Sequence, residues 1–384
     1  MVAIACGGTG GHLIPGLAVA EELVKRRCAV VLLISPKEVD QQVVKSVSGV
    51  EIVTLPAVAL QAGSRMAFLR GAWQSWRAAR ALFQIRSPGA VLAMGGFTSA
   101  PPVLAAKRLG ARTFLHESNS IPGRANRWLA RFVDQAFVGF PSAAARLRVR
   151  EATVVGTPVR QHFQMPADAA ACRVALGFEP SKPVLLVMGG SQGASGINAL
   201  LLVAMPLLAK RFPHWQWLHL AGSNDTDSVK RAYTAAGLKA VVFPFLTEME
   251  TALGAASAAV SRAGASSLAE IAAMRLPSLL VPFPYAADNH QFHNARAFSE
   301  TDAAWLLEQS AATPEKIAES LNELVENSST RARMQTALGQ WHSPQAAEQI
   351  ANTILKAVAE RTAVPVRAGK EAEVRNELKL KAVA

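Results

Sequence analysis

Short apolar runs alternate with longer segments of helical periodicity along most of the chain. The first run, VAIAC over residues 2–6, leads into a helical pattern over residues 15–27. These runs are continuously apolar, which is typical of parallel strands buried on both faces. Strands separated by helices predict an α/β fold of doubly wound parallel sheets. Further strands are expected at residues 30–35, 50–55, 90–94, 113–117, 135–139, 183–189, 215–222, 240–245, 258–262 and 278–282.

The length of the chain favours two domains of similar plan. Its 384 residues, 50% of them hydrophobic, are too many for one ordinary core and suit two domains of about 150 to 200 residues. A boundary is expected at Gly156-Thr157-Pro158-Val159-Arg160, where a strand-like TVV ends in a Gly and Pro pair. Near the end, apolar residues at i, i+4 spacing predict a packed helix. The expected units are an N-terminal domain over 1–157, a C-terminal domain over 158–344, a helix over 345–361 packing back across the domains, and a disordered tail over 362–384.

The net charge of +12 calls for an acidic partner: nucleic acid, an anionic membrane or phosphorylated substrates. Between Leu60 and Ala90 there are five arginines and no Asp, Glu or Lys, interleaved with bulky apolar residues. Such a helix either lies on an anionic bilayer or packs its apolar stripe inward with its arginines solvated. A similar cluster over residues 124–132 favours the membrane, and nucleic acid is not expected because no motif for it accompanies the charge. The residues expected at the membrane are Phe68, Trp73, Trp76, Arg77, Arg80 and Trp128.

The remaining composition predicts a cytoplasmic protein without a metal. Cys6, Cys28 and Cys172 are scattered, as expected in a reducing compartment. There is no charged leader and no apolar run of about 18 residues, so neither export nor a membrane span is expected. No metal-ligand cluster appears, and Asp225-Thr226-Asp227 is interpreted as a turn and helix cap. No cofactor is therefore expected.

Glycine-rich turns follow several predicted strands. They are GGTGGH at residues 7–12, GGFTSAP at 95–101 and GGSQGA at 189–194, with RAGASS at 262–267 as a fourth turn. In open parallel sheets ligands bind beyond the carboxyl ends of the strands, where glycine admits a phosphate and the next helix offers free N–H groups. A dinucleotide turn would need a third glycine where Leu13 stands, and no Lys-Ser or Lys-Thr of a P-loop follows. The pattern favours a sugar nucleotide held between two domains.

Seven segments, in order from Val2 to about Glu360, closely resemble the MurG family of bacterial glycosyltransferases. This family moves N-acetylglucosamine from UDP-N-acetylglucosamine to the undecaprenyl-diphosphate-linked muramoyl pentapeptide, turning lipid I into lipid II. The segments are GGTGGHLIPGLAVAEEL, MGGFTSAPPVLAA, HESNSIPGRANR, VVGTPVR, GGSQGASGIN, SRAGASSLAEIAAMRLPSLLVPFP and DNHQFHNA.

The resemblance implies a GT-B fold, the acceptor on the N-terminal domain, UDP-N-acetylglucosamine on the C-terminal domain, and inversion at the anomeric carbon. It also implies peripheral attachment to the cytoplasmic face of the plasma membrane. The implied partners are UDP-N-acetylglucosamine, lipid I, an anionic membrane surface and other cell-wall synthesis proteins. The alternatives are a glycolipid transferase or epimerase of the same fold, and a non-catalytic scaffold that binds sugar nucleotides.

Two residues are candidates for the general base that takes the proton of the acceptor hydroxyl. His12 closes the first turn and could instead cap the helix or contact acceptor phosphate. Glu117, in HESN, could instead be a strand-end carboxylate bound to backbone amides. The acceptor diphosphate is expected at the glycine turns, on Gly7, Gly8, Gly95 and Gly96.

The resemblance places the donor mainly on the C-terminal motifs. Glu270 would hold the ribose hydroxyls, although SLAE also reads as a capping box. Arg160 would stabilise the leaving diphosphate, or form an interdomain salt bridge. Ser191 could be an ordinary N-cap, Asn119 could hold a turn, and His290 departs from the glutamine of some members. The full expected donor set is Thr9, Gly10, Gly11, Asn119, Arg160, Ser191, Gln192, Leu246, Arg262, Ala265, Ser266, Ser267, Glu270, His290 and Gln291.

Overall fold

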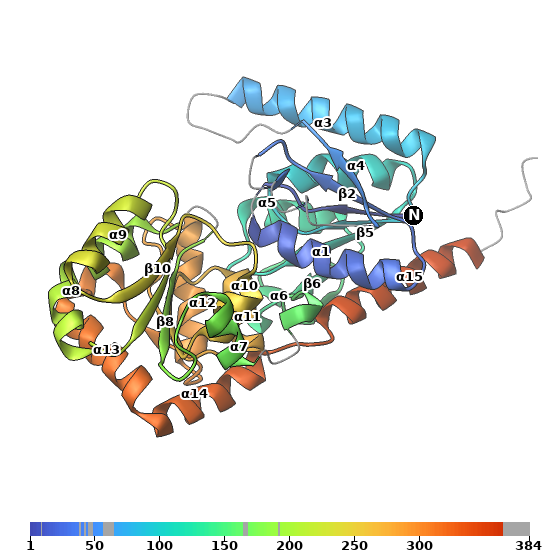
Figure 1. Ribbon diagram of the computed structural model, residues 1–384. Coiled ribbons are helices and arrows are strands. Elements are labelled where there is room, and N and C mark those ends of the chain that lie inside the picture. The colour runs from blue at the N-terminus through green and yellow to red at the C-terminus, as the bar shows by residue number, and fades with distance from the viewer. Residues whose placement is uncertain are drawn as a thin grey trace, which may run out of the picture.

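A computed structural model of the chain describes residues 1–8, 10–37, 40–41, 44, 49–56, 65–163, 168–190 and 193–363. It contains two separate parallel sheets with helices on both faces (Figure 1). We call the parts of the chain around these sheets the N-terminal lobe and the C-terminal lobe. The predicted α/β class of two doubly wound parallel sheets is confirmed.

The N-terminal lobe has seven strands in the order β3-β2-β1-β4-β5-β6-β7. Every neighbouring pair is parallel, and the strand order reverses between β1 and β4. Such a reversal opens a crevice at the carboxyl ends of the strands. The strands are β1 (Val2–Ala5), β2 (Val30–Ile34), β3 (Glu51–Thr54), β4 (Ala90–Ala93), β5 (Arg112–Glu117), β6 (Gln135–Val138) and β7 (Ala152–Val154).

The C-terminal lobe repeats this plan with six strands in the order β10-β9-β8-β11-β12-β13. All pairs are again parallel, and the reversal lies between β8 and β11. The apolar runs did not predict β13, because it has only two half-buried residues. The strands are β8 (Val184–Met188), β9 (Gln216–Leu220), β10 (Lys239–Phe243), β11 (Ala258–Ser261), β12 (Ser278–Leu280) and β13 (Trp305–Leu306).

Helices cover both faces of each sheet. Those of the N-terminal lobe are α1 (Gly10–Lys25), α3 (Arg65–Ile85), α4 (Ala100–Arg108), α5 (Arg124–Leu129) and α6 (Pro141–Ala144). Those that follow are α7 (Ala169–Ala175), α8 (Ser195–Arg211), α9 (Thr226–Ala235), α10 (Met249–Ala255), α11 (Ala265–Ala273), α12 (His290–Ser299), α13 (Pro314–Glu326), α14 (Ser328–Trp341) and α15 (Ala346–Ala363). Short 3₁₀ turns are η1 (Phe97–Ser99), η2 (Ala130–Phe132), η3 (Gln161–Phe163), η4 (Ala287–Asn289) and η5 (Gln309–Ala311).

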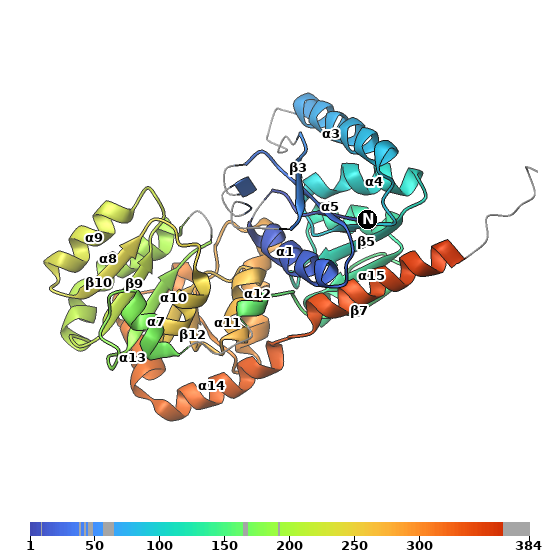
Figure 2. The ribbon, with the colours of Figure 1, turned by 45° about the vertical axis from the view of Figure 1, so that its right-hand side comes forward.

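The last helix leaves the C-terminal lobe and packs on the N-terminal lobe. Helix α15 lies along α1 and the N-terminal sheet (Figure 2). Its buried residues Ala346, Ile350 and Ile354 recur every four positions, which places them on one face of the helix. Ile350 and Ile354 join the apolar core between α1 and the sheet. This contact joins the two ends of the described chain in one core.

The two lobes also share an aromatic contact. Phe140, which follows β6, has its ring 5.3 Å from the ring of Trp341 on α14 and 6.3 Å from that of Phe298 on α12. Phe298 and Trp341 stack at 4.4 Å. Phe140 is therefore a residue of the N-terminal lobe whose ring is part of the C-terminal core.

Candidate functional site

The two lobes meet where the first turns of α1 and α11 face each other, between the two sheets in Figure 1. The hydroxyl of Ser266 donates to the backbone oxygen of Gly11 at 2.9 Å across this boundary. Both helices begin directly after a central strand of their sheet. The first N–H groups of each helix lack intrahelical partners and favour an anion. The boundary therefore combines two helix N-termini suited to phosphate.

His12 lies against the second glycine turn. A Cβ built on Gly95 would be 2.9 Å from His12 Nε2, and one on Gly96 would be 3.1 Å from His12 Cε1. Both glycines also have positive φ, at 117° and 77°, a region that side chains disfavour. The two glycines thus make room for the imidazole, and the turns at 7–12 and 95–101 form one site.

The imidazole of His12 is neutral near pH 7. Burial lowers its pKa to about 4, the charge of Asp40 raises it, and the charges of Lys37 and His290 lower it further. A neutral imidazole can accept a proton, as a general base must.

The first turn is bound to residues that the sequence analysis missed. The N–H of Gly8 donates to Asp40 Oδ2 at 2.7 Å, so this amide already has a partner within the protein. The ammonium of Lys37 donates to the backbone oxygen of Gly8 at 2.8 Å. Asp40 is fully buried and also accepts from the Ser35 hydroxyl. No motif marks Asp40 or Lys37, because only the fold brings the loop after β2 to this turn.

Hydrogen bonds connect the two glycine turns to each other. The hydroxyl of Thr98 donates to the backbone oxygen of Gly7, and that of Ser99 donates to Ala5 and Gly95. A Cβ on Gly7 would come within 2.3 Å of the Ser35 nitrogen, so this position needs glycine for close packing against the end of β2.

Glu117 anchors its own loop. One carboxylate oxygen accepts from the N–H and side-chain amide of Asn119, at 2.8 and 3.1 Å. The other accepts from the N–H of Gly123 and from Asn126 Nδ2, at 3.0 and 2.7 Å. Burial raises the pKa of Glu117, and these hydrogen bonds lower it. With both oxygens occupied, the geometry favours the strand-end anchor over a catalytic base.

Asn294 on α12 is a buried link between the lobes. Its side-chain oxygen accepts from the N–H and hydroxyl of Ser120, both at 2.9 Å. Its amide nitrogen donates to Asn119 Oδ1 and to the backbone oxygen of Ala263, both at 3.1 Å. The sequence analysis included this residue in DNHQFHNA but gave it no role. Asn119 consequently lies between Glu117 and Asn294, at the boundary of the lobes.

Glu270 does not belong to a capping box. Helix α11 starts at Ala265 with Gly264 as its N-cap, so Ser267 lies inside the first turn and cannot cap it. The side chain of Glu270 is nearly buried, with 9% of the residue exposed. Burial raises the pKa of Glu270 to about 7, the charge of Arg160 lowers it, and that of Glu250 raises it.

Arg160 lies at the crossing between the lobes, close to these two carboxylates. Its Nη2 is 3.9 Å from Glu250 Oε2, and its guanidinium lies 5.4 Å from the ring centroid of Phe163. The sequence analysis did not single out Glu250, on α10. Arg160 therefore forms an ion pair with the C-terminal lobe and still acts electrostatically on Glu270.

Arg262 fixes the turn after β11. Its guanidinium donates to the backbone oxygens of Val281 and Pro282, both at 3.0 Å, and to Gln309 Oε1 at 2.9 Å. Burial lowers the pKa of Arg262 to about 10. These contacts hold the ends of β11 and β12 together, so the arginine shapes the turn that begins with Ala263.

The loop before α12 is held from both lobes. Gln291 Oε1 accepts from the N–H groups of Ala263 and Phe283, at 3.2 and 3.0 Å. His290 Nδ1 lies 2.9 Å from the backbone oxygen of Ala287, which makes this nitrogen the donor and Nε2 the acceptor in the neutral ring. Asp288 pairs with Arg127 at 2.7 Å and Arg124 at 3.2 Å, both on α5.

The other expected site residues are placed as follows. Leu246 lies half-buried between β10 and α10, against the C-terminal core. Gly10 and Gly11 open α1, and Ala265 to Ser267 open α11. Thr9, Ser191 and Gln192 lie outside the described residues.

Asp225 stands at the expected N-cap position of α9, but its carboxylate accepts from Asn198 Nδ2 instead of a helix amide. Among the side chains that the structure describes, no three or more His, Cys, Asp or Glu residues are grouped to hold a metal.

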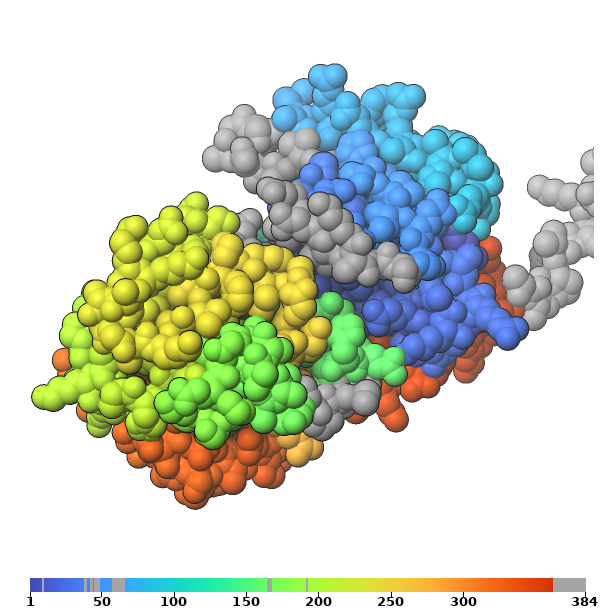
Figure 3. All heavy atoms as spheres, in the orientation of Figure 1, coloured from blue at the N-terminus to red at the C-terminus, as the bar shows by residue number. Residues whose placement is uncertain are grey.

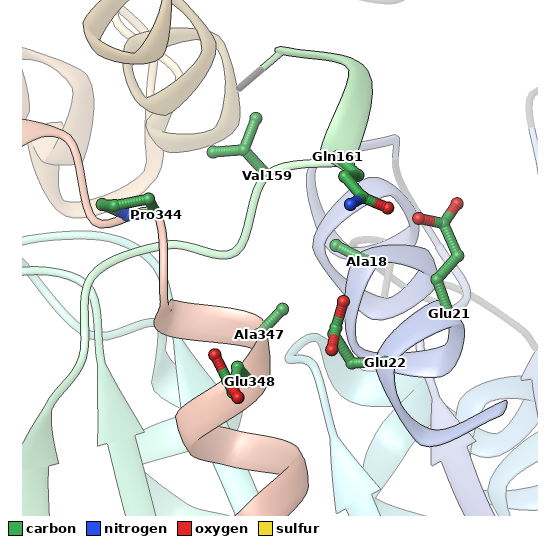
Figure 4. A pocket seen from close by; sticks show the side chains of 8 residues that line it. All are labelled: Ala18, Glu21, Glu22, Val159, Gln161, Pro344, Ala347 and Glu348. Carbon is green, nitrogen blue, oxygen red and sulfur yellow. The ribbon is translucent and has the colours of Figure 1, made fainter. Parts of the chain in front are cut away.

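A pocket of about 180 Å³ lies beside the crossing between the lobes, apart from the glycine turns (Figure 4). It is lined by α1, the crossing segment and the start of α15, and three carboxylates border it. Lys25 donates to Glu22 and Gln161 at 2.6 and 2.7 Å, and Arg26 donates to Glu348 at 2.9 Å. These contacts describe an ion-pair network at the hinge. None of the expected site residues lines this pocket.

Helix α3 buries one face and exposes another. Ser75, Ala79 and Phe83 are buried at four-residue spacing, while Met66, Leu69 and Trp73 are 80%, 59% and 55% exposed. The exposed residues belong to the outer end of the N-terminal lobe, away from the C-terminal lobe (Figure 3). Arg77 lies 4.7 Å from the Trp73 ring, and its cation–π contact leaves both side chains at the surface.

The other expected membrane residues differ in exposure. Trp76 is half-buried, with Arg80 and Arg108 over its ring at 5.4 and 5.5 Å. Trp128 is exposed on α5 and packs on Phe132. In the part of the chain that the structure covers, no helix is long and apolar enough to cross a membrane.

Comparisons with known proteins agree with this architecture. The N-terminal domain of glycosyltransferase family 28 matches residues 2–138, and the C-terminal domain of that family matches residues 184–353. The chain is 36% identical over 381 residues to the UDP-N-acetylglucosamine–N-acetylmuramyl-(pentapeptide) pyrophosphoryl-undecaprenol N-acetylglucosamine transferase of Anaeromyxobacter sp. (strain K), covering 96% of each chain. It is 32% identical to the transferase of the same name from Myxococcus xanthus, covering 97% of this chain and 98% of that one.

Solved structures show the same fold. The crystal structure of Acinetobacter baumannii MurG matches with a TM-score of 0.71 and 26% identity, over 92% of this chain and 99% of that one. A putative UDP-N-acetylglucosamine 2-epimerase from Listeria monocytogenes matches with a TM-score of 0.69 and 15% identity, over 94% and 97% of the chains, a likeness of fold alone. Both family domains and the full-length relatives lead to one assignment: the chain is a member of glycosyltransferase family 28, with a GT-B fold, and belongs to its MurG branch.

Proposed function

We propose that this protein transfers N-acetylglucosamine from UDP-N-acetylglucosamine to lipid I, making lipid II for peptidoglycan. The observation that carries the proposal is His12, a neutral imidazole between two glycine turns, facing the lobe that carries the donor motifs. Full-length relatives named for this reaction support it. The alternatives of an epimerase or a scaffold have no comparable support.

The donor binds on the C-terminal lobe. The Glu270 carboxylate accepts hydrogen bonds from the ribose hydroxyls, a task suited to two acceptor oxygens. Arg160 supplies positive charge to the leaving diphosphate, which lowers the barrier without a metal. Gln291 and His290 contact the sugar hydroxyls from a loop that Ala263 and Arg127 hold in place.

The acceptor diphosphate binds on the N-terminal lobe, at the first turn of α1 and the turn at Gly95 and Gly96. Because the Gly8 amide is occupied by Asp40, the phosphate donors are the next amides of α1 and the Lys37 ammonium. His12 takes the proton of the muramoyl hydroxyl as the hydroxyl attacks the anomeric carbon from the face opposite UDP. This in-line attack inverts the configuration at that carbon.

The test is direct transfer. The protein is incubated with labelled UDP-N-acetylglucosamine and a short-chain lipid I analogue, and labelled disaccharide lipid is the expected product. Binding without transfer would support a scaffold, and transfer only to another lipid would support a glycolipid enzyme. Inversion at C2 of the sugar without an acceptor would support an epimerase.

Donor affinity should depend on the ionisation of Glu270. Its pKa is raised to about 7, so the carboxylate that accepts from ribose is lost as the pH falls through 7. The KM for UDP-N-acetylglucosamine should rise about tenfold from pH 8 to pH 6, the ratio of ionised fractions for a pKa near 7. Glu270→Gln should raise KM at pH 8 and remove this pH dependence. An unchanged profile in that variant would exclude the ribose role.

The exposed face of α3 attaches the protein to the cytoplasmic face of the plasma membrane. Met66, Leu69 and Trp73 supply apolar area, and Arg70, Arg77 and Arg80 supply charge on exposed positions of the same helix. Trp76 contributes less, because it is half-buried between arginines. Binding to other cell-wall synthesis proteins remains a proposal from the resemblance alone.

Vesicle binding tests this attachment. Arg77→Ala should weaken binding to anionic vesicles about fivefold, because each arginine near such a surface contributes about 1 kcal/mol, and added salt should reduce the difference. Trp73→Ala should weaken binding further by removing apolar contact. Arg231→Ala, an exposed arginine on α9, is the matched control. Equal binding by all three variants and the parent would contradict the assignment, and sedimentation with vesicles measures it.

A further inference from the structure

Phe68 and Phe97 form an aromatic pair that belongs to no core of the described residues. Their ring centroids are 6.0 Å apart, with the planes at 59°, and both side chains are half-buried. Neither ring is among the residues of the hydrophobic clusters that the described part of the chain forms. A pair of phenylalanines outside the core offers apolar area to a ligand.

Phe97 is fixed next to the phosphate-binding turns. It follows Gly96 directly, and the next residue, Thr98, donates to Gly7 of the first turn. Gly95 and Gly96 enclose the His12 ring. One residue therefore separates the glycine turn from an apolar surface.

Phe68 continues that surface towards the membrane face of the protein. It stands on α3 between Met66 and Leu69, whose side chains are 80% and 59% exposed. Helix α3 itself packs through the positions of Ser75, Ala79 and Phe83. The apolar surface thus runs without interruption by charge from Phe97 through Phe68 to Leu69.

We propose that Phe97 and Phe68 bind the first isoprene units of the acceptor's prenyl chain, between the glycine turn and the exposed face of α3. The inference rests on the proposed function and names a substrate subsite for it. In a prenyl diphosphate the hydrocarbon begins at the oxygen of the phosphate, so its binding site must change from phosphate donors to apolar surface within one or two residues. The order Gly95-Gly96-Phe97, followed in space by Phe68 and Leu69, has this polarity.

Binding of simple diphosphates tests the subsite without any transfer reaction. The probes are geranyl diphosphate and ethyl diphosphate, titrated calorimetrically into the full chain without vesicles. The protein should bind geranyl diphosphate at least about tenfold more tightly, the effect of burying two methylene groups. Phe97→Ala and Phe68→Ala should reduce this preference to about twofold or less, with little change for ethyl diphosphate.

Two further variants make the test specific. Phe97→Leu keeps apolar bulk next to the turn and should retain most of the preference, which separates loss of contact from disruption of the turn. Phe132→Ala removes a ring from another half-buried aromatic pair, with Trp128 at 4.8 Å, and should retain the full preference. Equal preference in the parent, Phe97→Ala and Phe68→Ala would overturn the subsite. The lipid I transfer assay judges the proposed function separately, because these probes carry no sugar.

Discussion

Replacing His12 by alanine should lower kcat by about 100- to 10,000-fold at saturating substrates, the range that a general base contributes. The imidazole is neutral because burial lowers its pKa to about 4, so nearly every molecule can accept a proton at pH 7. Steady-state rates with UDP-N-acetylglucosamine and a soluble lipid I analogue measure the change. Near-normal turnover at saturating acceptor would exclude the base.

His12→Gln distinguishes the base from a phosphate ligand. Glutamine can still donate to phosphate but cannot take a proton at this pH. If His12 is the base, the kcat of His12→Gln should fall as far as that of His12→Ala. A phosphate contact alone would instead raise the acceptor KM in His12→Ala and leave kcat largely intact in His12→Gln. His214→Ala changes a histidine with an exposed side chain and is the matched control for expression and folding.

Local sequence patterns predicted the fold and the position of the turns, but not what each turn contacts. Continuously apolar runs mark strands buried on both faces, and each glycine turn necessarily follows its strand. That Gly95 and Gly96 enclose His12 depends on the neighbouring places of β1 and β4 in the sheet, which the sequence does not state. The capping-box interpretation of Glu270 failed for a related reason, because the helix begins two residues before the apparent cap.

The residues that sequence reasoning missed share one property. Asp40, Lys37, Glu250 and Asn294 act on partners that lie far away in the chain, and none belongs to a motif with a fixed spacing. The sequence offered only residue type, and an isolated Asp, Lys, Glu or Asn is most often a surface residue. For Glu117 the sequence offered both readings, and four hydrogen bonds decide between them.

Replacing Asn294 by alanine should separate the two lobes energetically. The change would leave Ser120 and the oxygen of Ala263 without their partners at a fully buried position, and each unsatisfied buried group costs about 1–3 kcal/mol. The melting temperature should therefore fall. Turnover should fall about 100-fold even in the folded fraction, because a misplacement of about 1 Å between reacting groups has this effect.

A double-mutant cycle with Ser120→Ala shows whether the link itself is responsible. Ser120 donates its hydroxyl to Asn294 across the boundary, so the losses of stability in the two single variants should exceed that of the double variant when added, as expected for residues in contact. Calorimetric unfolding and kcat are measured for the four proteins. Additive losses would mean that Asn294 supports only its own lobe. Since Asn294 also donates to Asn119, beside the Glu117 anchor, a confirmed coupling would make this asparagine the contact through which α12 and the HESN loop hold donor and acceptor sites in register.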